Sequence, residues 1–143
     1  MKRAVILLMA LGAMLTLAAG VAVAAFVDCG DSSRARCDGT NRADQIEGTS
    51  GRDIIYAFDN PSGTFDVVNA RGGPDEVHGD GGRDDITGGS GADDLFGGPG
   101  NDIIDSVDGV NGNDYIDCGK GDNDRAFADP GDVVVRCETV TRR

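Results

Sequence analysis

The sequence predicts an all-β chain wound as a parallel β-solenoid, with a disulfide closing each end. Three features support this prediction: a nine-residue pattern that recurs in phase, a high glycine content, and two close pairs of cysteines that flank the pattern. Nineteen of the 23 glycines lie between Gly39 and Gly121. Each glycine inside a helix costs about 1 kcal/mol relative to alanine, so this region is not helical.

The repeating unit is G-G-x-G-x-D-x-U-x, in which U is a large aliphatic residue. The clearest copies are residues 79–87, 88–96 and 97–105, preceded by 48–56 and 70–78 and by a degenerate first copy at 39–47. Its sixth-position aspartates are Asp44, Asp53, Asp66, Asp75, Asp84, Asp93, Asp102, Asp114 and Asp124. Two residues after each lies Ile46, Ile55, Val68, Val77, Ile86, Leu95, Ile104, Ile116 or Ala126. The two series stay in phase through aspartate spacings of 9, 13, 9, 9, 9, 9, 12 and 10 residues, so the pattern is not a random Gly/Asp-rich tract.

Each unit combines a tight turn with one short strand. Glycine accepts the positive φ that tight turns need, and the D-x-U-x half is β-prone at the aliphatic position. Two units can form one coil with a strand on each side, and stacked coils point the aliphatic residues into a thin core. Roughly five coils with a strand spacing of about 4.8 Å would form a rod about 24 Å long. The ninth positions should face outward, and their mixed character argues against an ice-binding array or any strictly repetitive ligand; they are Glu47, Tyr56, Asn69, His78, Thr87, Phe96, Asp105 and Asp117.

The aspartates favour calcium as a partner. Stacked coils bring like charges together along each edge, which requires a cation between them. Calcium takes six to eight oxygen ligands in a flexible shell, including carboxylates and backbone carbonyls, whereas magnesium needs a tighter octahedral shell. Transition metals would favour histidine or cysteine ligands. A core with one aliphatic side chain per nine residues should not offset the entropy of folding by itself, so the sequence predicts folding coupled to binding of several calcium ions.

The repeats resemble the RTX family, the hemolysin-type calcium-binding nonapeptide repeats, over residues 39–126. The resemblance implies a parallel β-roll in which calcium lies between turns of neighbouring coils on the same edge. It implies that Asp75 faces Asp93 and that Asp84 faces Asp102 across adjacent coils. The implied metal ligands are Asp53, Asp66, Asp75, Asp84, Asp93, Asp102 and Asp114, with the turn glycines Gly73, Gly81, Gly82, Gly89, Gly91, Gly98 and Gly100. Asp44 and Asp124 lie in degenerate copies and are expected to serve only as caps.

The segments outside the repeats predict export and disulfide bonds. Residues 1–24 combine Lys2 and Arg3 with an apolar stretch and an A-x-A site, which is typical of a cleaved signal peptide; a retained membrane anchor is the alternative. Residues 25–38 and 127–143 are expected to form the two caps. The four cysteines allow three pairings, of which Cys29–Cys37 and Cys118–Cys137 close the shortest loops and are favoured over a zinc site.

The predicted function is that of a secreted calcium-binding protein, monomeric, acting as a structural or interaction module at the cell surface or outside the cell. The chain from Ala25 carries 25 acidic residues against 11 Lys and Arg, so nucleic acid is not expected as a partner. No catalytic motif is present, and His78, the single histidine, is expected on the surface. The alternative is a calcium-stabilised fragment of an extracellular hydrolase or toxin-like protein. An unidentified extracellular or cell-surface partner is also compatible with the sequence.

Overall fold

The computed structural model describes residues 25–30, 34–58 and 64–143, which form thirteen β-strands and no helix. The expected signal peptide lies outside the described residues. One sheet contains β1 (Ala25–Asp28), β3 (Asp44–Glu47), β5 (Val67–Asn69), β7 (Asp85–Thr87), β9 (Ile103–Asp105), β11 (Arg125–Ala128) and β13 (Thr139–Arg142). The other contains β2 (Arg34–Asp38), β4 (Arg52–Tyr56), β6 (Glu76–His78), β8 (Asp94–Pro99), β10 (Tyr115–Lys120) and β12 (Val133–Val135).

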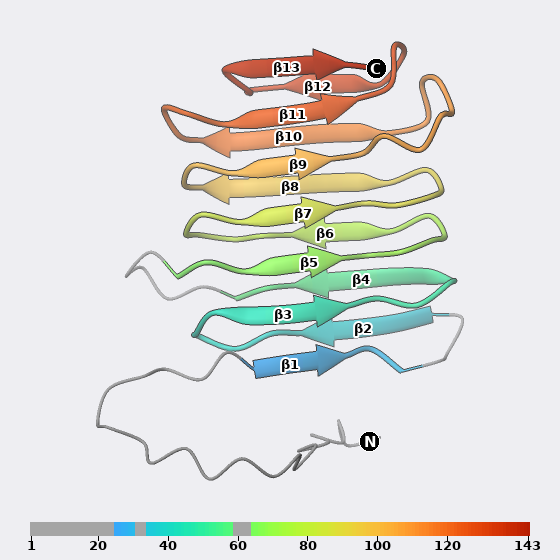
Figure 1. Cartoon of the computed structure of the whole chain (residues 1–143). Coiled ribbons are helices and arrows are strands. Elements are labelled where there is room, and N and C mark those ends of the chain that lie inside the picture. Colours follow the sequence, from blue (N-terminus) through green and yellow to red (C-terminus); the bar gives the residue numbers. More distant parts are fainter. Residues whose placement is uncertain (1–24, 31–33, 59–63) are drawn as a thin grey trace, which may run out of the picture.

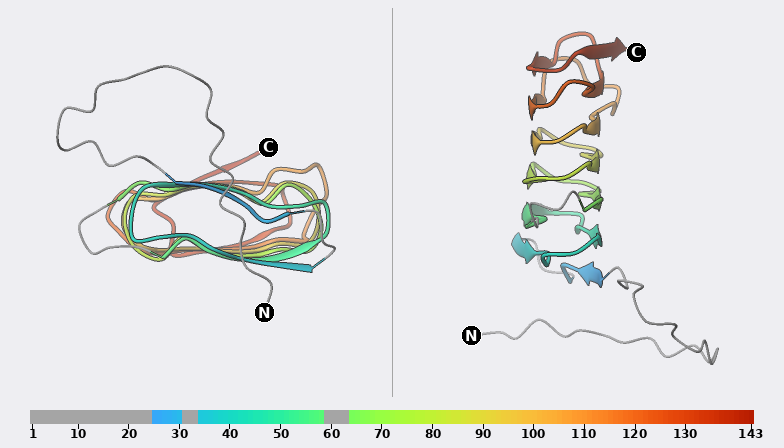
Figure 2. Two further views of the ribbon diagram at one scale, coloured as in Figure 1. Left: turned by 90° about the horizontal axis from the view of Figure 1, so that it is seen from below. Right: turned by 90° about the vertical axis from the view of Figure 1, so that its left-hand side faces the viewer.

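Successive strands alternate between the two sheets, and each strand pairs in parallel with the strands one coil before and after it. The chain therefore winds as a stack of flat coils, seen from the side in Figure 1 and along the axis in Figure 2. This is the predicted parallel β-solenoid, with about six turns rather than five. The count is higher because β1, β2, β12 and β13, which lie in the segments expected as caps, are further strands of the same two sheets.

The thin aliphatic core is confirmed. The nine aliphatic residues that follow the repeat aspartates by two positions are all at most 1% exposed. Their constant spacing from the aspartates predicted this burial. The strand registers place Val68 beside Ile86, and Ile86 beside Ile104, so each core side chain packs on its counterpart in the next coil. Small buried residues such as Ala57 and Ala70 fill the ends of the core, where the coil turns from one sheet to the other.

The outer face of the six-stranded sheet carries a column of stacked rings. His78 lies between Tyr56 and Phe96, with ring centroids 4.6 and 4.9 Å away and interplanar angles of 4° and 10°. Tyr115 continues the column at a tilt from Phe96, and the Arg36 guanidinium covers the ring of Tyr56. The ring column is not apparent from the ninth positions read in sequence order, because residues with rings alternate there with residues without rings. Alternate units belong to the same sheet, so the rings of Tyr56, His78 and Phe96 become neighbours.

The disulfides close both ends of the solenoid as favoured from the sequence. Cys29 is bonded to Cys37, which joins β1 and β2, and Cys118 in β10 is bonded to Cys137 just before β13. No free cysteine occurs in the part of the chain that the structure describes. Within that same part, no helix is long and apolar enough to cross a membrane.

Candidate metal centre

The sixth-position aspartates form two ladders, one along each edge of the solenoid. In each ladder the backbone N–H of one aspartate donates to Oδ1 of the aspartate one coil later. The first ladder is Asp44, Asp66, Asp84, Asp102 and Asp124, with N···Oδ1 distances of 2.6, 3.0, 2.9 and 2.8 Å. The second is Asp53, Asp75, Asp93 and Asp114, with distances of 2.7, 2.9 and 2.9 Å.

The ladders bring together the pairs that the resemblance implied. Asp75 is the neighbour of Asp93, and Asp84 is the neighbour of Asp102. Asp44 and Asp124 were expected only as caps, but Asp124 accepts from Asp102 as the central residues do, and Asp44 begins the first ladder by donating to Asp66. The insertions that separate some repeats therefore leave the ladder unbroken.

The ladder carboxyl groups are withdrawn from water. All nine are at most 3% exposed. Burial raises the pKa of Asp75 to about 7, and the carboxylates of Asp93 and Asp53 add to the rise while the N–H of Asp53 opposes it. Burial likewise raises the pKa of Asp114 to about 7, with contributions from Asp132 and Asp93. The column of acids thus favours a proton or another cation close to the carboxylates.

Four of these carboxyl groups also have one oxygen without a hydrogen-bond partner among the described residues. The atoms are Oδ2 of Asp75, Asp93, Asp114 and Asp124, and each is fully buried. A buried carboxylate oxygen without a donor is costly unless a cation lies beside it. The two N-terminal aspartates differ, because a backbone N–H donates to their Oδ2 atoms. Thr40 donates to Asp44 at 2.5 Å, and Thr49 donates to Asp53 at 2.6 Å.

The turn glycines let the turns of successive coils stack with their backbones in close contact. Gly73, Gly82, Gly89, Gly91 and Gly98 have φ between 97° and 143°, a region that disfavours other residues. Gly100 lacks this φ but is equally constrained, because a Cβ there would overlap the carbonyl oxygen of Gly82 in the turn one coil earlier. Gly81 lies between Asp80 and Gly82 in the same turn. At the first position of the unit, a Cβ on Gly88 would lie 2.7 Å from Oδ2 of Asp93, so glycine also makes room for the carboxylate.

These donors suit a hard cation that accepts carbonyl oxygens. Within the described residues, no group of three or more His, Cys, Asp or Glu side chains gathers at one point. Each position between turns therefore offers at most a pair of carboxylates, and the remaining ligands must be backbone carbonyls or water. Calcium accepts such a set, whereas zinc requires nitrogen or sulfur ligands in a tetrahedral site.

Sequence reasoning missed the residues that end the ladders. Asp132 continues the second ladder: its Oδ1 accepts from the N–H groups of Gly112 and, at 3.4 Å, Asp114. Glu138 ends the first ladder by accepting from the N–H of Asp124 at 2.8 Å. A signal was present, because Asp132 follows Asp114 by one 18-residue coil and precedes Val134 by two residues.

His78 lies outside both ladders. Its Nε2 is 2.9 Å from Oε1 of Glu76 on the same strand, and its ring belongs to the aromatic column on the outer sheet face. Its side chain is partly exposed, in agreement with the predicted surface position. The histidine therefore lies apart from both aspartate ladders.

Comparison with known proteins identifies the repeat. The family described as the RTX calcium-binding nonapeptide repeat matches in four copies, over residues 38–60 and 69–104. No curated protein and no solved structure matches the chain. The aspartate ladders continue beyond the matched residues, through Asp114 and Asp124 to the C-terminal end of the solenoid.

Proposed function

We propose, from the premise that this chain is a β-roll of RTX calcium-binding nonapeptide repeats, that it binds calcium ions along both edges and folds as it binds them. The RTX repeats and the solenoid mark it as a calcium-binding structural module. The ions would lie between successive turns, with the seven ligand aspartates predicted from the sequence and with the turn carbonyls. Asp44 and Asp124 join this set because the same hydrogen bonds between coils connect them to the first ladder.

The observation that carries this proposal is the buried ladder of carboxylates. Several acids at most 3% exposed lie one coil apart on each edge, and four of them have an oxygen without a hydrogen-bond partner among the described residues. Ionised in the absence of metal, such columns destabilise the fold through desolvation and mutual repulsion. Calcium relieves both, because it replaces water as a ligand and carries two positive charges. About six ions would nearly balance the charge of −14 on the chain from Ala25.

We further propose that the protein is exported and acts as a structural or interaction module outside the cell. Two disulfides support this setting, because they persist in oxidising compartments. Extracellular calcium modules bind at about 10⁻⁴ to 10⁻³ M, which would keep the chain unfolded at the low calcium concentration inside a cell and order it outside. On this proposal the chain has no catalytic role of its own, since β-rolls of this kind serve structure.

The test is circular dichroism of the disulfide-bonded protein, titrated with calcium and separately with magnesium. We expect β-structure to rise cooperatively with calcium in the range of about 10⁻⁴ to 10⁻³ M, and magnesium at the same concentrations to have a much smaller effect. Equal β-structure in excess chelator and in millimolar calcium would show that folding does not depend on the metal. Calorimetry of the same titration would give the number of ions bound.

A further inference from the structure

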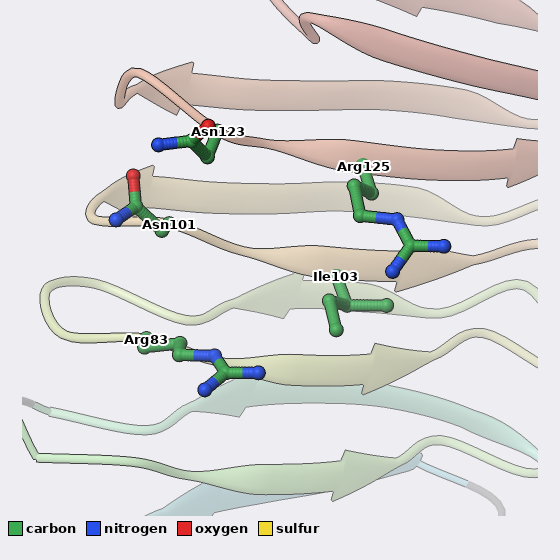
Figure 3. Close-up of a pocket in the computed structure, with 5 residues that line it drawn as sticks. All are labelled: Arg83, Asn101, Ile103, Asn123 and Arg125. Atoms are coloured by element: carbon green, nitrogen blue, oxygen red, sulfur yellow. The ribbon is translucent and has the colours of Figure 1, made fainter.

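The outer face of the seven-stranded sheet contains a groove of about 250 Å³, lined by Arg83, Asn101, Ile103, Asn123 and Arg125 (Figure 3). Its members come from three neighbouring coils of that sheet. Ile103 begins β9, Arg125 begins β11, and Arg83 lies just before β7. All five belong to the fifth and seventh positions of the repeat, so they flank the buried aspartates of the first ladder in sequence, and none of them is a ladder residue.

The groove holds two guanidinium groups that no acid among the described residues neutralises directly. The ion pairs in that part of the chain involve Arg36, Arg71, His78 and Arg136. Arg83 and Arg125 are instead placed by aromatic rings, with guanidinium carbons 5.9 Å from the ring centre of Phe65 and 5.4 Å from that of Phe127. The groove therefore places two guanidinium groups together in a chain with 25 acidic and 13 basic residues.

The asparagines add directed hydrogen-bonding groups. Oδ1 of Asn101 accepts from the backbone N–H of Asp122 at 3.3 Å, which leaves the Nδ2 of Asn101 as a donor at the groove. Asn123 occupies the equivalent position one coil later, and its carboxamide can both donate and accept. Ile103 supplies an apolar surface between the two arginines, as Figure 3 shows.

The spacing of these groups indicates a ligand larger than a simple ion. Two strand spacings separate β7 from β11, and Arg83 lies two residues before Asp85, the β7 residue in register with Ile103 and Arg125. The backbones that carry the two arginines are therefore roughly 11 to 12 Å apart. A guanidinium recognises a carboxylate with two parallel hydrogen bonds and stays charged at all physiological pH values. A single carboxylate can occupy one such fork, and the other arginine and the carboxamides then remain for hydroxyl groups.

We propose that this groove binds a hydroxylated carboxylate of the sugar-acid class. The carboxylate pairs with one guanidinium, the hydroxyl groups bond to the second guanidinium and to the two carboxamides, and the apolar face of the ring rests on Ile103. Binding is stronger in calcium, because neutralising the aspartate ladders removes long-range repulsion between the acidic protein and an anion.

The test is a titration of the calcium-bound protein with D-galacturonate at about 150 mM salt, which screens non-specific attraction. The readout is the shift of the side-chain amide NMR signals of Asn101 and Asn123. We expect saturable shifts with galacturonate and at least fivefold weaker binding for D-galactose, acetate and inorganic sulfate. Acetate or sulfate equal to galacturonate would overturn the sugar assignment, and galactose equal to galacturonate would overturn the role of the arginines.

Three variants complete the test. Arg83→Gln and Arg125→Gln should each weaken galacturonate binding at least fivefold, with unchanged circular dichroism in calcium. Arg36→Gln is the matched control, because it removes the same charge from the opposite sheet and should change binding less than twofold. An equal loss in all three variants, or the absence of saturable shifts in folded protein, would overturn the site. Circular dichroism in calcium shows whether the protein has folded, so a lack of galacturonate binding by folded protein is distinguished from a failure of calcium-dependent folding.

Discussion

The backbone N–H of Asp75 lies 2.9 Å from Oδ1 of Asp93, which is one coil further along the chain. The same carboxyl group leaves Oδ2 of Asp93 buried and without a hydrogen-bond partner among the described residues. One side chain therefore joins two coils through one oxygen and presents the other to a cation. On the proposed function, this division links the stability of the β-roll to calcium.

The substitution Asp93→Asn should weaken calcium binding. The new carboxamide keeps most of the side-chain volume and an oxygen for the N–H of Asp75, but it lacks the charge that calcium requires. We expect the midpoint of the calcium titration, followed by circular dichroism, to rise about tenfold, which corresponds to about 1.4 kcal/mol.

The control for Asp93→Asn is Asp94→Asn, which makes the same charge change at the adjacent exposed residue. Its calcium midpoint should change less than twofold. Equal shifts in the two variants would mean that only net charge matters and would remove Asp93 from the ligand set.

The stability of the metal-free chain should depend on pH through Asp75 and Asp114. Burial raises the pKa of each to about 7 in the folded chain, whereas an aspartate in an unfolded chain titrates near about pH 4. The folded state therefore binds more protons between these values, so its stabilisation is complete below about pH 4 and is lost as the pH rises through about 7.

Circular dichroism in chelator should accordingly show more β-structure at pH 5.5 than at pH 8. Protons and calcium compete for the same carboxylates, so the calcium midpoint should also shift to higher concentration at pH 5.5. Metal-free β-structure that increases with pH over this range would contradict the buried-carboxylate interpretation.

Asp80→Gly should stabilise the calcium-bound protein. Asp80 occupies the second position of its unit with φ of 66°, where the following two units have Gly89 and Gly98. A residue with a Cβ costs roughly 1 to 2 kcal/mol in this conformation, partly offset by the greater freedom of glycine in the unfolded chain. We expect about 1 kcal/mol of additional stability in urea denaturation with saturating calcium.

Asp80→Asn separates backbone strain from charge, because it removes the negative charge and keeps the Cβ. It should recover only part of the gain. The reverse change, Gly98→Ala, should destabilise the fold, since the new Cβ would overlap the carbonyl oxygen of Asp80. A stabilising Gly98→Ala variant would contradict the stacked-turn geometry.

Asp132→Ala should destabilise the C-terminal end of the solenoid. Asp132 accepts hydrogen bonds from the N–H groups of Gly112 and Asp129 and from the hydroxyl group of Ser106. Loss of the carboxylate leaves these buried or partly buried donors unpaired, at about 1 to 3 kcal/mol for each group that water does not reach. We expect a loss of about 2 to 4 kcal/mol of unfolding free energy.

Asp122→Ala is the matched control for Asp132→Ala. Only the backbone N–H of Asp122 takes part in a hydrogen bond among those described, so its truncation should change the unfolding free energy by less than about 0.5 kcal/mol. Similar unfolding curves for the two variants would show that Asp132 is not part of the ladder.

The sequence by itself determined the solenoid, its core and the central residues of the two aspartate ladders. In each nine-residue unit the aliphatic residue follows the aspartate by two positions. When Leu95 packs in the core, Asp93 therefore lies at the edge of the coil, and the same relationship holds in each unit. The short loops between cysteines likewise favoured the pairings Cys29–Cys37 and Cys118–Cys137. Local spacing was sufficient for these features because each unit repeats the same backbone path.

Only the tertiary structure showed which outward side chains the stacked coils place side by side. Two units form one coil, so Tyr56, His78 and Phe96 become neighbours across a sheet although 18 or 22 residues separate them. The same stacking brings Arg83 and Arg125 into one groove and places Asp132 and Glu138 at the ends of the ladders. These contacts depend on how outward side chains and terminal turns of successive coils lie against one another, and the spacing within one unit does not specify this.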